Sequence, residues 1–406
     1  MPIKPDDHEV WNNRGIALYD LGRFEEAIAS YNQALKIKPD DHESWYNQGV
    51  ALENLGRLEE AITSYNQALK IKPDDHESWY NRGIALFNLG RLEEAIASYD
   101  QALSIKTDLH EAWYNRGIAL FNLGRLEGAI ASYNQALKIK PDYQDAWYNQ
   151  GVALENLGRL EEAIASYNQA LKIKPDCQDV WCNRGNALGD LGRFKEAIAS
   201  YEKAVSIKPD YHEAWYNRGY ALGNLGRLEE ALASYDQALK IKLDYHDAWY
   251  NRGYALFNLG RLEEAIDSFD QALKIKSDYQ DAWYNRGNAL GNLGRLEQAI
   301  ASYDQALKIK PDDHQASYNR GIALRKLGRL EEAIASFDQA LKIKPDKDNA
   351  WYNKACCHAL LGNVNLAIKN LQQAINLNPK CRQMAKTNTY FDNIREDSQF
   401  QDLINR

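Results

Sequence analysis

The hydrophobic and polar positions of the chain repeat with a period of about 34 residues. In one representative unit Trp45, Gly49 and Leu52 follow a spacing of i, i+4 and i+7, which predicts the buried stripe of a helix. A second stripe at helical spacing follows, made of Leu58, Ala61, Ile62, Tyr65, Ala68 and Leu69. Each unit is therefore predicted to be an antiparallel pair of helices, called below the first and the second helix.

A tryptophan marks the same place in almost every unit. The series is Trp11, Trp45, Trp79, Trp113, Trp147, Trp181, Trp215, Trp249, Trp283 and Trp351. Ser317 takes the place of the tryptophan that the period would put at that position. The ten tryptophans and the one skipped position give about eleven units that fill nearly the whole chain, and they leave no room for a separate catalytic domain.

Local signals predict where each helix begins and ends. Asp40 and Glu43 have the spacing of a capping box that opens the first helix, and the pattern recurs in later units. Gly56 is expected to take the left-handed conformation after that helix, and Pro73 to stop the second helix. A glycine within a helix costs roughly 1 kcal/mol relative to alanine, so Gly49 is expected to allow close packing.

These residues carry a family resemblance. The pattern Trp-x-x-Arg/Gln-Gly-x-x-Leu, then Ala-x-x-x-Tyr/Phe, then Ala and Pro, resembles the tetratricopeptide repeat over residues 8–381. The resemblance implies an all-α fold, an α-solenoid in which antiparallel helix pairs form a right-handed superhelix. It also implies that the first helix of each pair lines a concave groove. The proline of the pattern is lost at Thr107, Leu243 and Ser277.

The chain also departs from the family pattern three residues after the tryptophan position, where a leucine is usual. This position holds Arg14, Gln48, Arg82, Arg116, Gln150, Arg184, Arg218, Arg252, Arg286, Arg320 and Lys354. A charge in a partly buried region needs a partner, and an acid such as Asp40 or Glu43 of a neighbouring unit is expected to supply it. The arginines at the turn between the two helices, such as Arg57, are expected to be surface charges beside the glutamates that follow.

Two regions are predicted along the chain: an array of about eleven repeats at residues 1–381, and a capping helical segment at residues 382–406. The second region is amphipathic and is expected to form one or two helices that cover the last repeat. The first helix, which holds Trp11, has no preceding neighbour, so self-association through this uncovered N-terminal repeat is one expectation.

Composition narrows the function further. With 49 basic and 57 acidic residues the net charge is −8, which argues against nucleic acid as the main partner. The five cysteines follow no repeat position and predict no disulfide framework. No signal peptide and no apolar run of the ~20 residues that a membrane span requires are apparent. A soluble protein of the cytoplasm without membrane insertion is expected.

The main candidate for a binding site is a row of asparagines two positions after each tryptophan position. The candidates for peptide contact are Asn47, Asn81, Asn115, Asn149, Asn183, Asn217, Asn251, Asn285 and Asn319. Since the asparagine amide both donates and accepts hydrogen bonds, such a row can hold an extended peptide by its backbone. The alternative is that the same amides bond neighbouring helices.

Aromatic residues flank this row. The candidates for groove contacts are Tyr80, Tyr114, Tyr148, Tyr216, Tyr220, Tyr250, Tyr254 and Tyr284. They offer rigid contact surface for a partner, or they pack against the next helix pair. The positions five and eight residues after the tryptophan vary along the chain, from Ile118 and Phe121 to Asn288 and Gly291. The groove is therefore expected to be apolar with acidic spots in its first half, and more polar and roomier in its second.

Other functions fit the sequence less well. The resemblance implies that chaperone-binding members of the family hold the carboxyl-terminal acidic group of a partner with a clamp that includes a lysine. The residue directly after each tryptophan position, where that lysine would stand, is mostly tyrosine in this chain. A chaperone-adaptor role is therefore disfavoured. Histidines at the start of the first helices cannot share a metal across helices ~8–10 Å apart. Nucleotide, protease and hydrolase motifs are missing, so no enzyme, no cofactor and no metal are expected.

The sequence favours a non-enzymatic scaffold that binds extended peptide segments of protein partners in its groove. Two alternatives stay open: a substrate-targeting arm of an enzyme supplied by a missing region or another chain, and a self-assembling structural spacer. The identity of the partner is not encoded in any motif of the chain.

Overall fold

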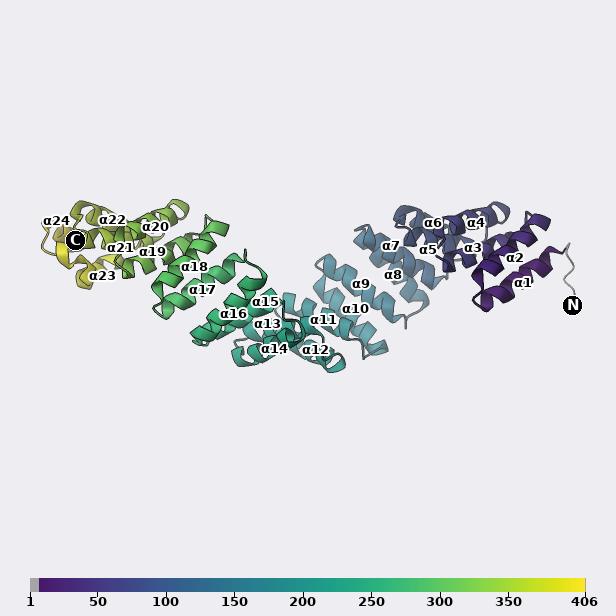
Figure 1. The fold of residues 1–406 in the computed structure, drawn as a ribbon, viewed down its shortest axis with the longest axis horizontal. Coiled ribbons are helices and arrows are strands. Elements are labelled where there is room, and N and C mark those ends of the chain that lie inside the picture. The colour runs from purple at the N-terminus through teal and green to yellow at the C-terminus, as the bar shows by residue number, and fades with distance from the viewer. Residues whose placement is uncertain (1–6, 406) are drawn as a thin grey trace. The chain divides into compact units, whose positions relative to one another are not determined.

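The computed structural model describes residues 7–405, and every regular element among them is a helix (Figure 1). The chain divides into two compact units, Met1–Pro209 and Asp210–Arg406. Residues 1–6 and 406, which the predicted array and cap include at their ends, lie outside the described residues. Helices that follow one another in the sequence pack as antiparallel pairs, which confirms the all-α solenoid. The handedness of the superhelix stays a prediction.

In its described part, residues 7–209, the first unit holds six helix pairs. Its first helices are α1 (His8–Asp20), α3 (His42–Asn54), α5 (His76–Asn88), α7 (His110–Asn122), α9 (Gln144–Asn156) and α11 (Gln178–Asp190). Its second helices are α2 (Phe24–Ile37), α4 (Leu58–Ile71), α6 (Leu92–Ile105), α8 (Leu126–Ile139), α10 (Leu160–Ile173) and α12 (Phe194–Ile207).

Over residues 210–405, the second unit holds five helix pairs and a C-terminal segment. Its first helices are α13 (His212–Asn224), α15 (His246–Asn258), α17 (Gln280–Asn292), α19 (His314–Lys326) and α21 (Asp348–Leu360). Its second helices are α14 (Leu228–Ile241), α16 (Leu262–Ile275), α18 (Leu296–Ile309), α20 (Leu330–Ile343) and α22 (Val364–Leu377). The C-terminal segment comprises α23 (Lys380–Thr387), the 3₁₀ helix η1 (Thr389–Ile394) and α24 (Ser398–Asn405).

The turn within each pair depends on one glycine. Gly56 has a φ of +73°, and ten more glycines at the same repeat position have φ between +71° and +77°. The amide of Gly56 donates to the carbonyl of Glu53 at 2.9 Å, and that of Arg57 donates to the carbonyl of Leu52 at 2.9 Å. These bonds satisfy the last carbonyls of the first helix, and the left-handed glycine is confirmed.

The start of the first helix is one residue later than predicted. The N-cap of α3 is Asp41 rather than Asp40, and the N-cap of α5 is Asp75, whose carboxylate accepts from the amide of Ser78 at 3.1 Å. The predicted capping box is wrong because Asp40 lies in the turn after Pro39, one residue too early for its side chain to reach the helix amides.

The two helices of a pair approach closely at the mid-helix glycine. A Cβ added to Gly49 would lie 2.5 Å from Cε1 of Tyr65, far inside van der Waals contact. Ala61 and Ala68 of the second helix are fully buried. Close packing is therefore confirmed as the reason why a glycine occupies this helix position.

The tryptophans are half-buried rather than buried, which corrects the stripe predicted for Trp45, Gly49 and Leu52. The indole N–H of Trp45 donates to the backbone carbonyl of Pro39 at 2.9 Å. The equivalent Trp113 donates to the carbonyl of Thr107 at 3.0 Å. Since the acceptor is a backbone carbonyl, loss of the proline does not remove this bond. In these repeats the tryptophan ties the first helix to the connection that precedes it.

The C-terminal segment packs on the last helix pair. Phe391 and Phe400 are fully buried and stack with ring centroids 5.4 Å apart. They share a core cluster with Tyr352 of α21 and Leu371 of α22. The predicted boundary between residues 381 and 382 lies inside α23, and the division into an array and a separate cap stays a prediction.

Candidate functional site

Within each of the two units, the asparagines of the predicted row bond residues of the preceding repeat. In eight rungs the asparagine Nδ2 donates to a tyrosine hydroxyl 35 residues earlier, at 2.8 to 3.1 Å. The pairs are Asn81–Tyr46, Asn115–Tyr80, Asn149–Tyr114, Asn183–Tyr148, Asn251–Tyr216, Asn285–Tyr250, Asn319–Tyr284 and Asn353–Tyr318. We call this set the asparagine–tyrosine ladder. It joins consecutive first helices.

Two ends of the ladder differ from the rest. Asn47 donates to Oδ1 of Asn12 at 3.2 Å, since the first repeat has Asn12 where the next repeats have a tyrosine. At the C-terminal end Asn388 donates to the hydroxyl of Tyr352 at 2.9 Å, so a residue of the C-terminal segment continues the pattern. Asn217 also interacts with another group.

The ladder uses only part of each amide. Within residues 7–405, Asn81, Asn115 and Asn149 have the tyrosine bond as their one side-chain hydrogen bond to the protein. Each therefore keeps Oδ1 and the second amide hydrogen for another partner. In the second unit Asn251 also bonds the carbonyl of Asp247, and Asn319 also bonds Oδ1 of Asn288, both at 3.0 Å.

The ladder tyrosines pack on the second helix of their own repeat. The ring of Tyr114 lies 6.0 Å from that of Tyr133, and the other ladder tyrosines have the same contact at 5.8 to 6.2 Å. Burial raises the pKa of Tyr114 to about 12, although its hydrogen bond with Asn149 acts in the opposite direction. The hydroxyl is therefore neutral at physiological pH. It accepts from the asparagine and can still donate.

Tyr220 and Tyr254 are the exception among the aromatic candidates. Their side chains are 53% and 47% exposed, whereas the ladder tyrosines are half-buried. They lie five positions after a tryptophan in α13 and α15, on the same helices as Tyr216 and Tyr250. Their rings are available to a partner without any change in the core.

The variable positions shape two kinds of surface beside the ladder. In the first unit Glu53 and Glu155 accept from the hydroxyls of Tyr65 at 2.9 Å and Tyr167 at 2.6 Å. Burial raises the pKa of both carboxyls, and the tyrosine hydrogen bond partly opposes this rise. These are the acidic spots that the sequence indicated.

In the second unit the smaller side chains leave a cavity. A space of about 290 Å³ is lined by residues that include Phe257, Asn288, Gly291, Ile322 and Lys326. We call it the Gly291 pocket. It combines ladder residues with the variable positions, as expected for a roomier second half.

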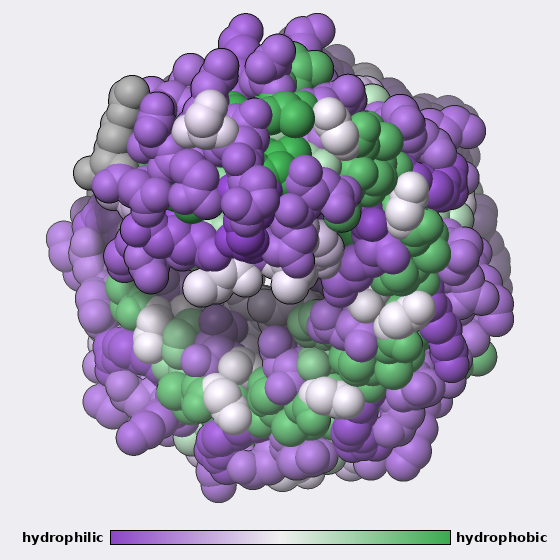
Figure 2. Space-filling view, turned by 90° about the vertical axis from the view of Figure 1, so that its left-hand side faces the viewer, coloured by the Kyte–Doolittle hydropathy of each residue, from purple (hydrophilic) through white to green (hydrophobic). Residues whose placement is uncertain are grey.

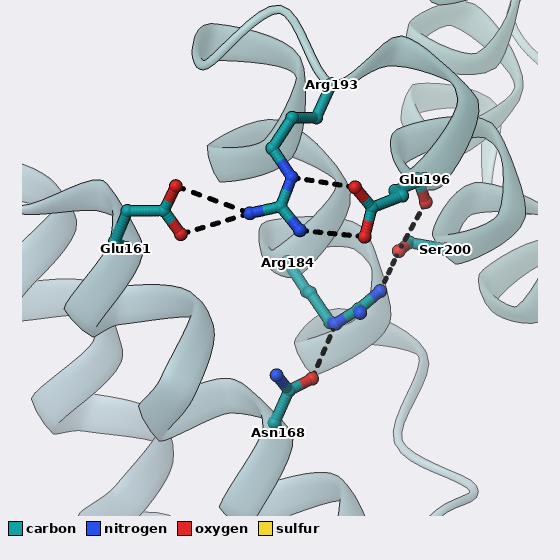
Figure 3. A network of polar contacts seen from close by, with 6 residues as sticks. All are labelled: Glu161, Asn168, Arg184, Arg193, Glu196 and Ser200. Carbon is teal, nitrogen blue, oxygen red and sulfur yellow. Dashed lines mark hydrogen bonds and ion pairs between the residues drawn. The ribbon is translucent and has the colours of Figure 1, made fainter.

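The basic residue three positions after the tryptophan holds three helices together (Figure 3). Nε of Arg184 donates to Oδ1 of Asn168 on α10 at 2.7 Å, and Nη1 donates to Oγ of Ser200 on α12 at 2.6 Å. Arg116, Arg252, Arg286 and Arg320 make the same bonds with an aspartate and a serine. The expected partners Asp40 and Glu43 are wrong, because the acceptor lies on the second helix of the preceding repeat.

The arginines of the turns form surface ion pairs. Arg193 donates to both Glu196, at 2.7 Å, and Glu161 of the preceding repeat, at 3.0 Å (Figure 3). The local pair recurs in other repeats, as in Arg57 with Glu60 at 2.6 Å, so the prediction of surface charges beside glutamates is confirmed.

One set of contacts has no counterpart in the sequence predictions. Tyr143, Tyr245 and Tyr279 occupy the N-cap position and pack with tilted rings on the ladder tyrosine of the preceding repeat, with centroids 4.8 to 4.9 Å apart. A lysine ammonium lies over each ring, for example Lys140 at 4.9 Å from Tyr143. The available signal was tyrosine where other repeats have an aspartate cap.

Among residues 7–405, no group of three or more His, Cys, Asp or Glu side chains is placed to hold a metal ion. None of the helices in that range is long and apolar enough to cross a membrane. Toward the C-terminal side of the molecule, the visible surface is mostly hydrophilic and its hydrophobic residues form separate small patches (Figure 2).

A comparison with solved structures found many similar chains. YrrB, described as a TPR protein with an unusual peptide-binding site, is 22% identical; the match covers 45% of this chain and 95% of YrrB, with a TM-score of 0.42. A tetratricopeptide repeat protein from Parabacteroides merdae is 19% identical over 61% of this chain and 98% of its own, with a TM-score of 0.44.

The APC/C hetero-tetramer Cut9–Hcn1 is 14% identical over 98% of this chain and 96% of the matched chain, with a TM-score of 0.43. At these TM-scores the three matches support no inference about this chain. A comparison with curated protein sequences found no match.

Family models match along most of the sequence. The model described as Tetratricopeptide repeat matches residues 12–76, 46–110, 114–176 and 284–348, and a second one of that description matches residues 349–381. The model described as TPR repeat matches residues 185–226, 224–260 and 253–294. The first model alone covers more than half of the chain, and the helix pairs and their glycine turns agree with it. The chain belongs to the tetratricopeptide repeat family.

Proposed function

We propose that this protein is a non-enzymatic scaffold that binds extended segments of partner proteins along the asparagine–tyrosine ladder. The observation that carries the proposal is the free half of the ladder amides. In Asn115 and Asn149, Oδ1 and one amide hydrogen have no protein partner among the described residues. An amide with one acceptor and one donor free matches the N–H and C=O of a peptide backbone.

The tyrosine bond supports this use because it fixes the amide in advance. Ordering a flexible side chain costs about 0.5–1.5 kcal/mol when a complex forms. The hydroxyls of Tyr80 and Tyr114 already hold the side chains of Asn115 and Asn149. A peptide that binds these rungs therefore avoids most of that cost, and many weak rungs in series add up to useful affinity.

The test separates ligand contact from helix-to-helix bonding. Changing Asn115, Asn149 and Asn183 to Ala removes both, whereas changing Tyr80, Tyr114 and Tyr148 to Phe removes only the inter-repeat bond. Partners are captured with the full chain, identified by mass spectrometry, and one purified partner segment is then titrated by calorimetry. At about 1 kcal/mol per hydrogen bond, the alanine variant should lose roughly 10- to 100-fold in affinity.

The phenylalanine variant is the matched control. It should lose less than about fivefold, since the asparagines remain and only their positioning weakens. Equal losses in the two variants would mean that the ladder acts only between helices. An unchanged affinity in the alanine variant, with circular dichroism like that of the wild type, would place the binding surface elsewhere and overturn the proposal.

A further inference from the structure

The Gly291 pocket lies in the second unit, where a variable position has lost its side chain. Gly291 stands eight positions after Trp283 on α17. A Cβ added there would meet nothing closer than the Tyr303 hydroxyl at 3.7 Å and the Ala299 Cβ at 3.9 Å. Unlike the mid-helix glycines that touch a ring, this glycine leaves open space above it.

An equivalent place in the first unit shows what fits there. Phe87 on α5 occupies the same repeat position as Gly291, and the surrounding Tyr99, Asn115 and Ile118 correspond to Tyr303, Asn319 and Ile322. The space left beside Phe87 is about 200 Å³, whereas the Gly291 pocket has about 290 Å³. The repeat scaffold therefore accommodates an aromatic ring at this place, and Gly291 leaves that space empty.

The walls of the pocket are suited to such a ring. Phe257, Leu296 and Ile322 supply apolar surface. A cavity of about 150 Å³ with apolar walls is enough to bind benzene. The Gly291 pocket exceeds that volume, so a phenylalanine or tyrosine side chain of a partner can enter without moving the helices.

The rim of the pocket is polar and positively charged. Oδ1 of Asn288 accepts from the Tyr303 hydroxyl at 2.9 Å and from Nδ2 of Asn319 at 3.0 Å, which fixes the polar wall. Among the described residues that line the pocket, Lys326 is the charged one and none is acidic. The equivalent residue in the first unit is Asn122, which carries no charge. An acidic group beside the guest ring would meet the ammonium of Lys326.

We propose that the Gly291 pocket binds a phenylalanine or tyrosine side chain of a partner segment, with an acidic residue beside it that pairs with Lys326. The proposal rests on the scaffold function above and adds a determinant of specificity to it. The ladder holds any extended backbone, and this pocket selects among sequences. It combines variable positions of neighbouring repeats with the constant ladder residues.

The probe is the N-acetyl-Phe-Glu dipeptide amide, with N-acetyl-Ala-Glu and N-acetyl-Phe-Lys amides as comparisons. Ligand-observed NMR with the full chain should show saturable binding of the first in the millimolar range, and at least tenfold weaker binding of the other two. The Gly291→Phe variant should abolish binding, because the introduced ring occupies the space as Phe87 does in the first unit. Gly223→Phe, at the same repeat position outside the lining, is the matched control and should bind like the wild type.

A second variant does not depend on core packing. Lys326→Glu lies on the surface and should weaken Phe-Glu binding at least threefold while it strengthens Phe-Lys binding. Absence of saturable Phe-Glu binding to the wild type would overturn the proposal, as would binding that neither Gly291→Phe nor Lys326→Glu changes.

If a captured partner depends on the ladder asparagines but tolerates Gly291→Phe, the scaffold function holds and the pocket does not select. If dipeptide binding depends on the pocket but the ladder variants leave partner binding intact, the ladder proposal fails by itself.

Discussion

At the residue scale, the same amino acid serves different ends according to what faces it. Gly56 stands in a left-handed turn, Gly49 touches an aromatic ring, and Gly291 borders an empty pocket. Of these three positions, only that of Gly49 must be glycine for the two helices to pack. A substitution at each kind should therefore give a different result.

The mid-helix glycines offer a stability test. In Gly117→Ala the new methyl would lie 2.5 Å from the Tyr133 ring, and overpacking of this kind costs about 1–3 kcal/mol. In Gly189→Ala the nearest group is the Tyr201 hydroxyl at 3.8 Å, so the helix preference for alanine should stabilise by up to about 1 kcal/mol. Urea midpoints of the two variants should move in opposite directions. If both midpoints move downward, contact with the tyrosine ring is not what distinguishes the two glycine positions.

At the scale of the elements, the interfaces between consecutive repeats within each of the two units are held by two polar links on different faces of the first helix. One is the ladder bond, such as Asn183 to Tyr148 at 3.1 Å. The other is the link through residues such as Arg184, which spans α10, α11 and α12 (Figure 3). Gln150 makes the same two contacts with uncharged partners, since its amide bonds Asn134 at 2.6 Å and Ser166 at 2.8 Å. What Arg184 and Gln150 have in common is therefore the geometry of the two contacts and not a charge.

This comparison predicts which substitution the interface tolerates. Arg184→Gln should be nearly neutral, because Asn168 and Ser200 can bond a glutamine as Asn134 and Ser166 do. Arg184→Met leaves both groups without their partner and should cost about 1–3 kcal/mol. Hydrogen exchange of the amides in α10–α12 measures the difference. Equal protection in the two variants would show that the polar link contributes nothing to the coupling of these repeats.

At the scale of the whole molecule, the hydrophobic core is a succession of local clusters. One joins residues from Leu18 to Tyr99 in the first unit, and another joins Tyr352 to the C-terminal segment in the second. Because each repeat packs on its neighbours, stability is expected to depend on nearest-neighbour interfaces, and the damage from a mutation should remain local.

The C-terminal segment allows this expectation to be checked. Phe400 is fully buried, and Phe400→Ala should cost about 3–5 kcal/mol. Hydrogen exchange should accelerate in α21–α24 and stay unchanged in α13–α16. Met384→Ala, at a side chain that is 48% exposed, is the control and should change stability by less than about 0.5 kcal/mol. A uniform loss of protection along the second unit would instead indicate a single cooperative unit.

The sequence by itself determined the repeat, the helix pairs, the glycine turns and the close packing at Gly49, because these depend on local periodicity and backbone preference. Tertiary structure alone decided which groups meet across repeats. The ladder asparagines bond tyrosines 35 residues earlier, and Arg184 bonds Asn168 rather than an acid of the first helix, since the partner depends on how neighbouring helices pack. The same holds for the Gly291 pocket: the missing side chain is visible in the sequence, but the cavity exists only because walls from α15, α17, α18 and α19 surround it.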